Sequence, residues 1–283
     1  MPNPIVKTLM PWIKEAPRVA VIRLAGVIAS GGRLSSAGLS VAGIAQTLER
    51  AFKLKPAAVA LDINSPGGSA AQSHLIYKRI RGLAAEKKLP VLAFVEDAAA
   101  SGGYMIACAA DEIFVDENSI VGSIGVISSG FGFTELIAKL GVERRVHAAG
   151  EYKSTLDPFR PEDPGDIERL KAIQAEIHRD FIALVKERRG ARLKGGGELF
   201  TGEFWAGKRA VELGLADGIG DIKAVLEARY GSKVRLIPVA AERGFLRRRL
   251  GLETSLSGGI GSGLTENAVS ALEARALWSR YGL

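Results

Sequence analysis

Ser101 has the surroundings that best suit nucleophilic chemistry in this sequence. It lies in residues 97–103 (DAAASGG), directly after an apolar run at residues 90–96 and directly before small residues at 104–110. A serine at a strand-to-helix turn is presented at the carboxyl edge of a sheet, where the sites of open α/β folds gather. The same position also suits a helix N-cap, so a structural role and a catalytic role are both open.

A serine hydroxyl becomes a nucleophile only when a base takes its proton. The three histidines are His74, His147 and His178. Only His147 has plausible catalytic neighbours, and no carboxylate beside it would orient the ring, so the pattern does not favour a Ser–His triad. Lys153, in the stretch GEYKS, is another base if burial lowers its pKa by ~3–5 units. The alternative is that Lys153 is an ordinary exposed charge.

A second glycine-rich loop, residues 64–68 (NSPGG), also follows an apolar run and precedes a helical pattern. Pro66 removes a backbone donor and fixes φ, while Gly67 and Gly68 let the backbone approach a ligand without an intervening Cβ. Such a loop can hold an anion with its N–H groups, although a simple tight turn would have the same sequence. Neither G-x-G-x-x-G nor a Walker pattern is present, so a nucleotide site is not indicated.

Apolar strands alternate with helical patterns along most of the chain, which predicts an α/β fold. Because the strands are continuously apolar, we expect a mostly parallel sheet that is covered on both faces. The expected strands are residues 18–24, 57–63, 90–96, 112–115 and 144–147. The expected helices are residues 41–53, 69–87, 104–110, 134–140 and 166–188, with a last helix near 266–278.

The composition restricts the class of protein further. The chain has 283 residues, 47% of them hydrophobic, which is enough for a large core. A single cysteine, Cys108, excludes an intramolecular disulfide and suits a small buried position. The net charge is +7, and a local basic cluster lies near the C-terminus at Arg243, Arg247, Arg248 and Arg249. Such a cluster suits an anionic membrane surface at least as well as nucleic acid.

Neither a transmembrane helix nor a signal peptide is predicted. No run approaches the ~20 apolar residues that a membrane-spanning helix needs. The N-terminal segment, residues 1–16, is interrupted by Pro4 and Pro11 and lacks the apolar centre of a signal peptide. We therefore expect a cytoplasmic or peripheral membrane location.

Four stretches make the chain resemble the signal peptide peptidase A (SppA) family of Ser–Lys peptidases, in its short single-unit form. They are LDINSPGGSA, EDAAASGGYMIACAADEIFVDENSIVGSIGVIS, GEYKSTLDPF and FTGEFWAGKRAVELGLADGIGD. Together they cover about residues 57–222 in the family's order. The separation of 52 positions between Ser101 and Lys153 is also the one the family shows.

The resemblance implies a crotonase/Clp-like fold with stacked, mostly parallel sheets and flanking helices. It assigns Ser101 as the nucleophile and Lys153 as the general base. Ser123 matches the serine that orients the lysine, and Gly68 and Gly102 match the backbone donors of the oxyanion hole. The peptidase domain would then be residues 17–240, followed by a basic C-terminal tail, residues 241–283, that contains a short helix. No cofactor and no metal are implied.

The implied activity is that of a serine endopeptidase that hydrolyses hydrophobic peptides such as cleaved signal peptides. The family builds its active sites across subunits of ring-shaped oligomers, so we expect a homo-oligomer. The basic tail suggests a peripheral membrane contact, and no nucleic-acid partner is expected.

Two other functions fit the same fold. A crotonase-like acyl-CoA enzyme would use paired N–H groups to hold a thioester oxyanion, but it gives no reason for Ser101, Ser123 and Lys153 to occur together. A non-catalytic membrane-associated scaffold would have no need of an intact dyad.

Overall fold

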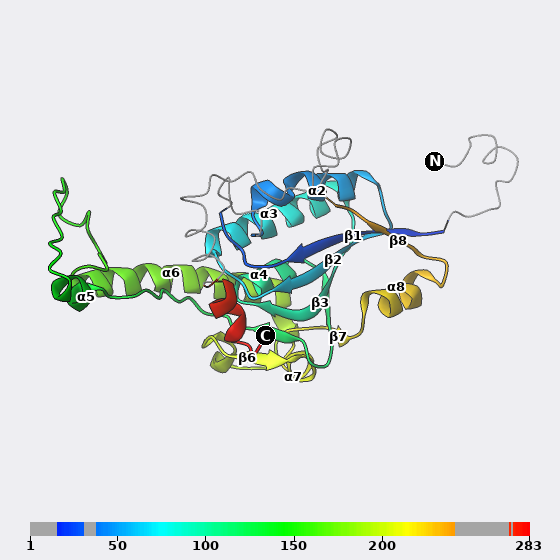
Figure 1. Cartoon of the computed structure of the whole chain (residues 1–283). Coiled ribbons are helices and arrows are strands. Elements are labelled where there is room, and N and C mark those ends of the chain that lie inside the picture. Colours follow the sequence, from blue (N-terminus) through cyan, green and yellow to red (C-terminus); the bar gives the residue numbers. More distant parts are fainter. Residues whose placement is uncertain (1–15, 31–37, 241–271, 273) are drawn as a thin grey trace, which may run out of the picture.

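A computed structural model describes residues 16–30, 38–240, 272 and 274–283 of the chain (Figure 1). The N-terminal segment, the basic arginine cluster and most of the tail lie outside the described residues, so the expected membrane contact stays a prediction. The described residues form a mixed α/β fold around an eight-stranded sheet, which confirms the predicted fold class. None of the described helices is long and apolar enough to cross a membrane.

The sheet is almost entirely parallel. Its main path runs in the order β6-β5-β3-β2-β1-β8, and β4 and β7 extend it from β3. Only the β5–β6 pair is antiparallel. The strands are β1 (Arg18–Ala25), β2 (Ala58–Ser65), β3 (Val91–Ala100), β4 (Glu112–Val115), β5 (Ile120–Gly122), β6 (Phe204–Ala206), β7 (Gly218–Ile219) and β8 (Arg235–Pro238).

The sheet divides at β3. The first part of this ten-residue strand pairs with β4 through residues 92–95, and its last part pairs with β5 through residues 98–100. The two branches therefore leave β3 at different heights. The end of β3 and the end of β5 meet at one edge of the sheet.

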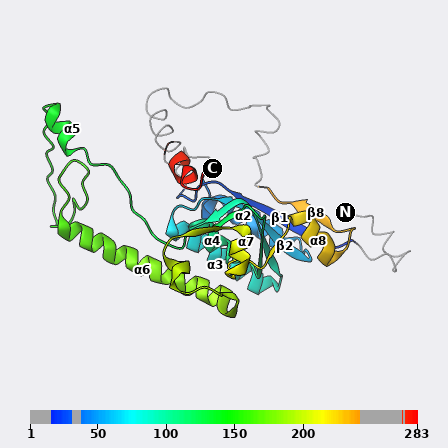
Figure 2. The ribbon, with the colours of Figure 1, turned by 90° about the horizontal axis from the view of Figure 1, so that it is seen from below.

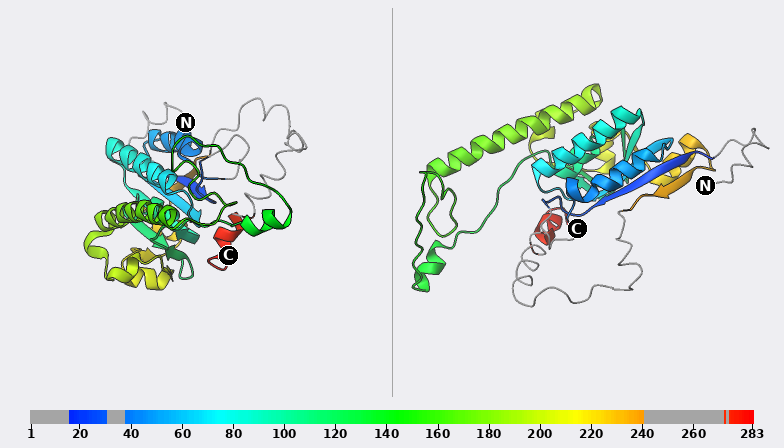
Figure 3. Two further views of the ribbon diagram at one scale, coloured as in Figure 1. Left: turned by 90° about the vertical axis from the view of Figure 1, so that its left-hand side faces the viewer. Right: turned by 90° about the horizontal axis from the view of Figure 1, so that it is seen from above.

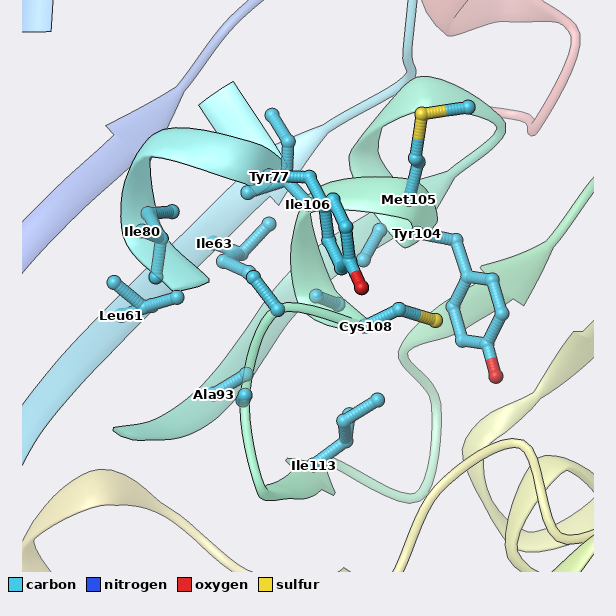
Figure 4. Close-up of a cluster of buried hydrophobic side chains, with 14 of the residues drawn as sticks. Leu61, Ile63, Tyr77, Ile80, Ala93, Tyr104, Met105, Ile106, Cys108 and Ile113 are labelled. Atoms are coloured by element: carbon cyan, nitrogen blue, oxygen red, sulfur yellow. The ribbon is translucent and has the colours of Figure 1, made fainter. Parts of the chain in front are cut away.

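Helices pack mainly on one face of the sheet (Figure 1). Alternate residues of β2, such as Leu61 and Ile63, point toward the helices and join the larger core, while Ala58 and Ala60 point to the opposite face. Figure 4 shows part of the larger core, in which Leu61, Ile63 and Ile80 lie together. The helices that contribute to it are α2 (Val41–Lys53), α3 (Ala70–Lys87), α4 (Gly102–Ala107), α6 (Pro164–Arg189) and α7 (Gly207–Glu212).

Described residues cover the opposite face only in part, so the expectation of two covered faces stays a prediction. Helix α8 (Ile222–Tyr230) places Leu226 against Ala58, Ala60 and the neighbouring apolar side chains. Farther toward the carboxyl ends of the strands this face is polar. There Arg23 forms ion pairs with Asp62 at 3.0 Å and with Glu96 at 2.6 Å. A charged, half-exposed face needs no apolar cover.

An arm, residues 126–163, extends away from the sheet together with the first half of α6 (Figures 2 and 3). It contains α5 (Thr134–Lys139), but residues 144–147 form no strand, so that prediction is wrong. A strand needs a neighbour to satisfy its backbone groups, and these residues are exposed with none beside them. The helices expected at 134–140 and 166–188 are present at 134–139 and 164–189.

The remaining described elements are short. Two 3₁₀ helices follow α6, η1 (Gly190–Arg192) and η2 (Gly197–Phe200). Near the end of the chain, residues 272 and 274–279 are helical, and the earlier part of the last helix expected from the sequence lies outside the described residues. Residues 280–282 then form a turn.

Candidate active site

Ser101 is held in a strained backbone conformation at the junction of β3 and α4. Its φ is 52° and its ψ is −119°, a region that residues with a Cβ rarely occupy. The Ser101 N–H donates to the Gly122 carbonyl at 2.8 Å, and the Ser101 carbonyl accepts from the Met105 N–H at 3.0 Å. The hydroxyl makes no capping hydrogen bond to α4, so the N-cap alternative is wrong. Strain of this kind clusters at functional sites.

The loop that ends β2 lies directly against Ser101. A Cβ on Gly67 would lie 2.8 Å from the Ser101 Cβ, and a Cβ on Gly68 would lie 2.1 Å from the Ile28 carbonyl oxygen. A Cβ on Gly102 would lie 2.2 Å from the Ser73 Oγ. The close approach of neighbouring atoms therefore requires glycine at all three positions. The loop at residues 64–68 is thus more than the simple tight turn that its sequence would also allow.

The backbone donors expected for an oxyanion hole are free of backbone partners. Among the described turn, loop and cap hydrogen bonds, neither the Gly68 N–H nor the Gly102 N–H donates to a carbonyl. The two glycines flank Ser101, and both line the same cavity as that serine. A carbonyl oxygen that becomes an oxyanion beside Ser101 could therefore accept from both.

Ser123 follows β5 and is buried beside this loop. It has a φ of 52°, and its N–H donates to the Glu203 carbonyl at 2.7 Å. Its Oγ is 3.3 Å from the hydroxyl of Tyr281, which also lies 3.4 Å from the Pro66 carbonyl oxygen. Ser123 is thus placed at the edge of the sheet where β3 ends at Ser101.

A cavity of about 370 Å³ lies beside Ser101. Its lining is mostly apolar, and Arg280 is the one charged residue among the described residues that line it. The apolar side chains come from α4, α6, the start of the arm and the C-terminal helical residues: Met105, Val126, Ile127, Ile177, Phe181 and Leu277. Such a pocket suits an apolar side chain of a bound peptide. A larger hollow of about 830 Å³ lies in the arm, and Ser101 does not line it.

Lys153 is not brought to Ser101 within one chain. It lies in a series of turns in the arm, where its N–H donates to the Gly150 carbonyl at 3.2 Å and its side chain is exposed. No described hydrogen bond joins its amine to Ser101 or Ser123. The structure therefore brings together Ser101, Ser123 and the two glycines and leaves the expected base outside.

The histidines do not form a catalytic triad with Ser101 in the described residues. His147 is exposed in the arm, and His74 stacks on Tyr77 with ring centroids 6.1 Å apart. Burial and the nearby Lys78 lower the pKa of His74. His178 lies on α6, and its Nε2 donates to the Ile124 carbonyl at 3.0 Å, beside the Ser123 turn.

Sequence reasoning set aside one residue near the site, His178, and missed another, Tyr281. His178 shares α6 with the cavity-lining residues Ile177 and Phe181. Tyr281 is 158 positions from Ser123, so no local pattern could have connected them.

A buried polar group supports α4 from behind. Arg189 forms a bidentate ion pair with Asp217 at 2.7 and 3.0 Å, and the Tyr104 hydroxyl donates to the Leu215 carbonyl at 2.8 Å. Tyr104 and Cys108 lie side by side in the core (Figure 4). Burial raises the pKa of the Cys108 thiol to about 12, which fits the predicted inert, buried cysteine.

Comparison with known families identifies the class of protein. The model of peptidase family S49 matches residues 84–235, which include Ser101, Ser123 and Lys153. The match favours the peptidase class over an acyl-CoA enzyme of similar fold. The chain belongs to peptidase family S49, and the resemblance to the SppA group is confirmed.

Two curated relatives are considerably longer than the aligned region. The chain is 52% identical over 287 residues to a Brucella abortus protein named Na(+)/H(+) antiporter NhaA, covering 99% of this chain and 39% of that protein. It is 31% identical over 229 residues to the chloroplastic serine protease SPPA of Arabidopsis thaliana, covering 77% of this chain and 33% of that protein. Because the alignment covers so little of the first relative, its name assigns no transport activity to this chain.

A solved structure has the same fold. The 1510-N membrane-bound stomatin-specific protease, as a lysine-to-alanine mutant in complex with a substrate peptide, aligns with a TM-score of 0.51 and 17% identity. The alignment covers 81% of this chain and 95% of that one. At this level of identity the likeness shows the Clp-like fold.

Proposed function

We propose that this peptidase is a serine endopeptidase whose nucleophile is Ser101. The observation that carries the proposal is the strained turn that holds Ser101 against the Gly67–Gly68 loop beside an apolar cavity. Nothing in the packing of α4 requires a serine there, because its hydroxyl does not cap the helix. The turn presents the hydroxyl to the cavity, and the free N–H groups of Gly68 and Gly102 flank it.

The base would be Lys153 of a neighbouring copy. In one chain Lys153 is exposed in the arm, and its amine has no described bond to Ser101. The arm also exposes large apolar side chains, among them Phe131 and Leu140, with 80% and 67% of their surfaces accessible. Exposed apolar groups in such number mark a contact surface. An arm that docks on the next copy would bury them and carry Lys153 to that copy's site.

Repeated docking of this kind is heterologous, so a closed assembly would be a ring of identical subunits. The apolar walls of the partner would exclude water from the lysine amine. Desolvation favours the neutral form of an amine, which is the form that can accept a proton. Ser123, at the edge beside Ser101, would hold the amine in place through its hydroxyl.

The reaction steps follow from these positions. The neutral amine of Lys153 takes the Ser101 proton as the Oγ attacks a peptide carbonyl carbon. The carbonyl oxygen becomes negative and accepts hydrogen bonds from the Gly68 and Gly102 N–H groups, each contributing about 3 kcal/mol to the barrier reduction. The C–N bond then breaks, and the ammonium returns its proton to the leaving amine. A water activated by the same lysine hydrolyses the acyl ester and restores the Ser101 hydroxyl.

The substrate class would be hydrophobic peptides such as cleaved signal peptides. The cavity beside Ser101 is lined by Met105, Ile177 and Phe181, which can surround one medium-sized apolar side chain. An apolar residue just before the scissile bond would fill it. Peptidomics of membrane and soluble fractions, with wild type compared with Ser101→Ala, would identify the natural substrates.

A fluorophosphonate probe tests the nucleophile. Ser101→Ala is expected to abolish labelling, and Lys153→Met to reduce it sharply, because the serine then has no base. Ser129→Ala is the matched control, since Ser129 lines the same cavity without a strained backbone. Undiminished labelling of both Ser101→Ala and Lys153→Met would contradict the dyad.

Mixing two inactive variants tests whether the base comes from another copy. Chains with Ser101→Ala still carry the lysine, and chains with Lys153→Met still carry the serine. Co-assembled chains are expected to recover part of the wild-type peptidase rate. If separately purified variants stay inactive after co-assembly, the serine and the lysine act within one chain.

A further inference from the structure

The helical residues 274–279 and the turn that follows them lie against the candidate active site (Figures 1 and 2). We refer to residues 274–283 as the cap. Leu277 and Arg280 of the cap line the cavity beside Ser101. These contacts come from the end of the chain, far in sequence from every other residue of the site.

Tyr281 attaches the cap to the site. Only 7% of its surface is exposed, and its ring meets that of Phe204 edge to face at a centroid distance of 5.0 Å. Its hydroxyl lies 3.3 Å from the Ser123 Oγ and 3.4 Å from the Pro66 carbonyl oxygen. Since the carbonyl can only accept, the Tyr281 hydroxyl donates to Pro66, and the Ser123 hydroxyl can then donate to the Tyr281 oxygen. Tyr281 thereby joins the loop that carries Gly68 to the serine at the end of β5.

This position conflicts with the proposed role of Ser123. A lysine amine that is oriented by the Ser123 hydroxyl must lie within about 3 Å of the Ser123 Oγ. The phenol of Tyr281 lies 3.3 Å from this Oγ, and Leu277 is part of the wall of the cavity beside Ser101. Because Ser123 is almost fully buried, the Tyr281 phenol competes with a neighbouring copy's lysine for access to the Ser123 hydroxyl.

Part of the cap lies at the surface. Beyond Tyr281 its outer side is exposed, and large apolar side chains such as Leu283 remain accessible. Because the cap is part of the same chain, it competes with an incoming peptide at a high effective concentration. A weak contact is then sufficient to keep the site mostly closed.

We propose that the cap is an autoinhibitory element that closes the active site of an isolated chain and is displaced when a peptide and the arm of another copy arrive. The inference rests on the proposed function, because it needs Ser101 to be the nucleophile and Ser123 to receive the base. It predicts that activity depends on release of Tyr281 as well as on assembly.

The first test removes only the Tyr281 hydroxyl. In the full chain Tyr281→Phe is expected to raise fluorophosphonate labelling of Ser101, and hydrolysis of an alanine- and leucine-rich peptide, several-fold, because a larger fraction of sites is open. Tyr230→Phe is the matched control; Tyr230 lies on α8 in the smaller core and should not alter the rate. Rates that are unchanged or lower in Tyr281→Phe would overturn the proposal that the cap is autoinhibitory. A lower kcat would instead show that Tyr281 is a positioning residue for Ser123.

The second test compares two arginines of the cap. Arg280 lines the cavity and Arg275 does not, although both side chains are exposed. Arg280→Ala is expected to lower the KM for the peptide, while Arg275→Ala leaves it unchanged. Equal KM values for the two variants would contradict a cap that enters the substrate cavity.

Hydrogen–deuterium exchange separates failure of the cap from failure of the peptidase, because it needs no activity. Ser101→Ala is mixed with a fluorescein-labelled alanine–leucine peptide at a concentration where fluorescence anisotropy shows it bound. Hydrogen–deuterium exchange within residues 274–283 is expected to become faster when the peptide binds, because the cap is displaced. Unchanged exchange would overturn the proposal that the cap closes the site. If no variant is labelled by fluorophosphonate, wild type included, the proposed function is overturned. The hydrogen–deuterium exchange result still tests whether a bound peptide displaces the cap.

Discussion

Ser101 and Ser123 occupy equivalent positions at the ends of two neighbouring parallel strands. Ala100 of β3 pairs with Gly122 of β5, and each serine follows its paired residue with a φ of 52°. The Ser101 N–H donates to the Gly122 carbonyl, which joins the two turns directly. Two non-glycine residues in a disfavoured conformation at the same edge indicate that the surrounding sheet imposes the strain.

The first prediction concerns this strain. Ser101→Gly should be more stable than Ser101→Ala by about 1 kcal/mol, because alanine keeps the Cβ that makes a positive φ unfavourable. Guanidinium unfolding of the two variants measures the difference. Ser73, in the interior of α3, is the control: there Gly should be less stable than Ala. A more stable Ser101→Ala would mean that the turn relaxes without strain.

The second prediction concerns close approach at the glycine-rich loop. Gly68→Ala should destabilise the protein by about 1–3 kcal/mol and abolish labelling of Ser101, because the new Cβ meets the Ile28 carbonyl oxygen. Gly82→Ala is the matched control, since no atom lies within 4 Å of its added Cβ and the position is within α3. That change should add about 1 kcal/mol to the free energy of unfolding. Equal effects of the two substitutions would contradict the geometry of the loop.

The third prediction concerns Cys108. With a pKa of about 12, only on the order of one thiol in ten thousand is ionised at pH 8, and the thiol is also fully buried. Iodoacetamide should therefore leave the folded protein unmodified at pH 8 and modify it completely in guanidinium. Mass spectrometry measures both. Rapid modification of the folded chain at pH 8 would show that α4 opens without global unfolding.

The fourth prediction concerns the buried ion pair behind α4. Burial alone would raise the pKa of Asp217, but the hydrogen bonds from Arg189 and from the Ile113 N–H outweigh it and lower the pKa. Asp217→Asn should cost about 3–5 kcal/mol at pH 7, because it leaves the Arg189 charge buried without its partner. Glu227→Gln, which disrupts an exposed pair with Lys223, is the control and should cost less than about 1 kcal/mol.

The pH dependence of this pair has a definite sign. Since the folded pKa of Asp217 is below the unfolded one, its contribution is fully present above the ordinary aspartate pKa of about 3.9. It is lost as the pH falls through the lower, folded pKa. The stability difference between wild type and Asp217→Asn should therefore narrow below about pH 4. Urea unfolding of both proteins at a series of pH values measures this stability difference. A difference that does not change with pH would mean that Asp217 stabilises the fold through packing.

Much of the sheet and half of the site could be predicted from local patterns. Continuous apolar runs of the right length placed β1, β2 and β3 within one or a few residues, because burial on both sides of a strand leaves a strong signal. The turn at Ser101 and the close approach at Gly68 were also predictable, since glycine and small residues mark such positions. The strand expected at residues 144–147 is absent because a short local pattern does not supply a neighbouring strand.

The sequence by itself determined which groups are available for chemistry: a serine at a strand-to-helix turn, glycines that free backbone donors, and a lysine in the SppA-like segment. Only the tertiary structure decided which of them meet. Pairing of β3 with β5 places Ser123 beside Ser101, the arm holds Lys153 away from both, and Tyr281 reaches Ser123 across 158 positions. The physical reason is that such contacts depend on the packing of distant elements, on which local sequence places no constraint.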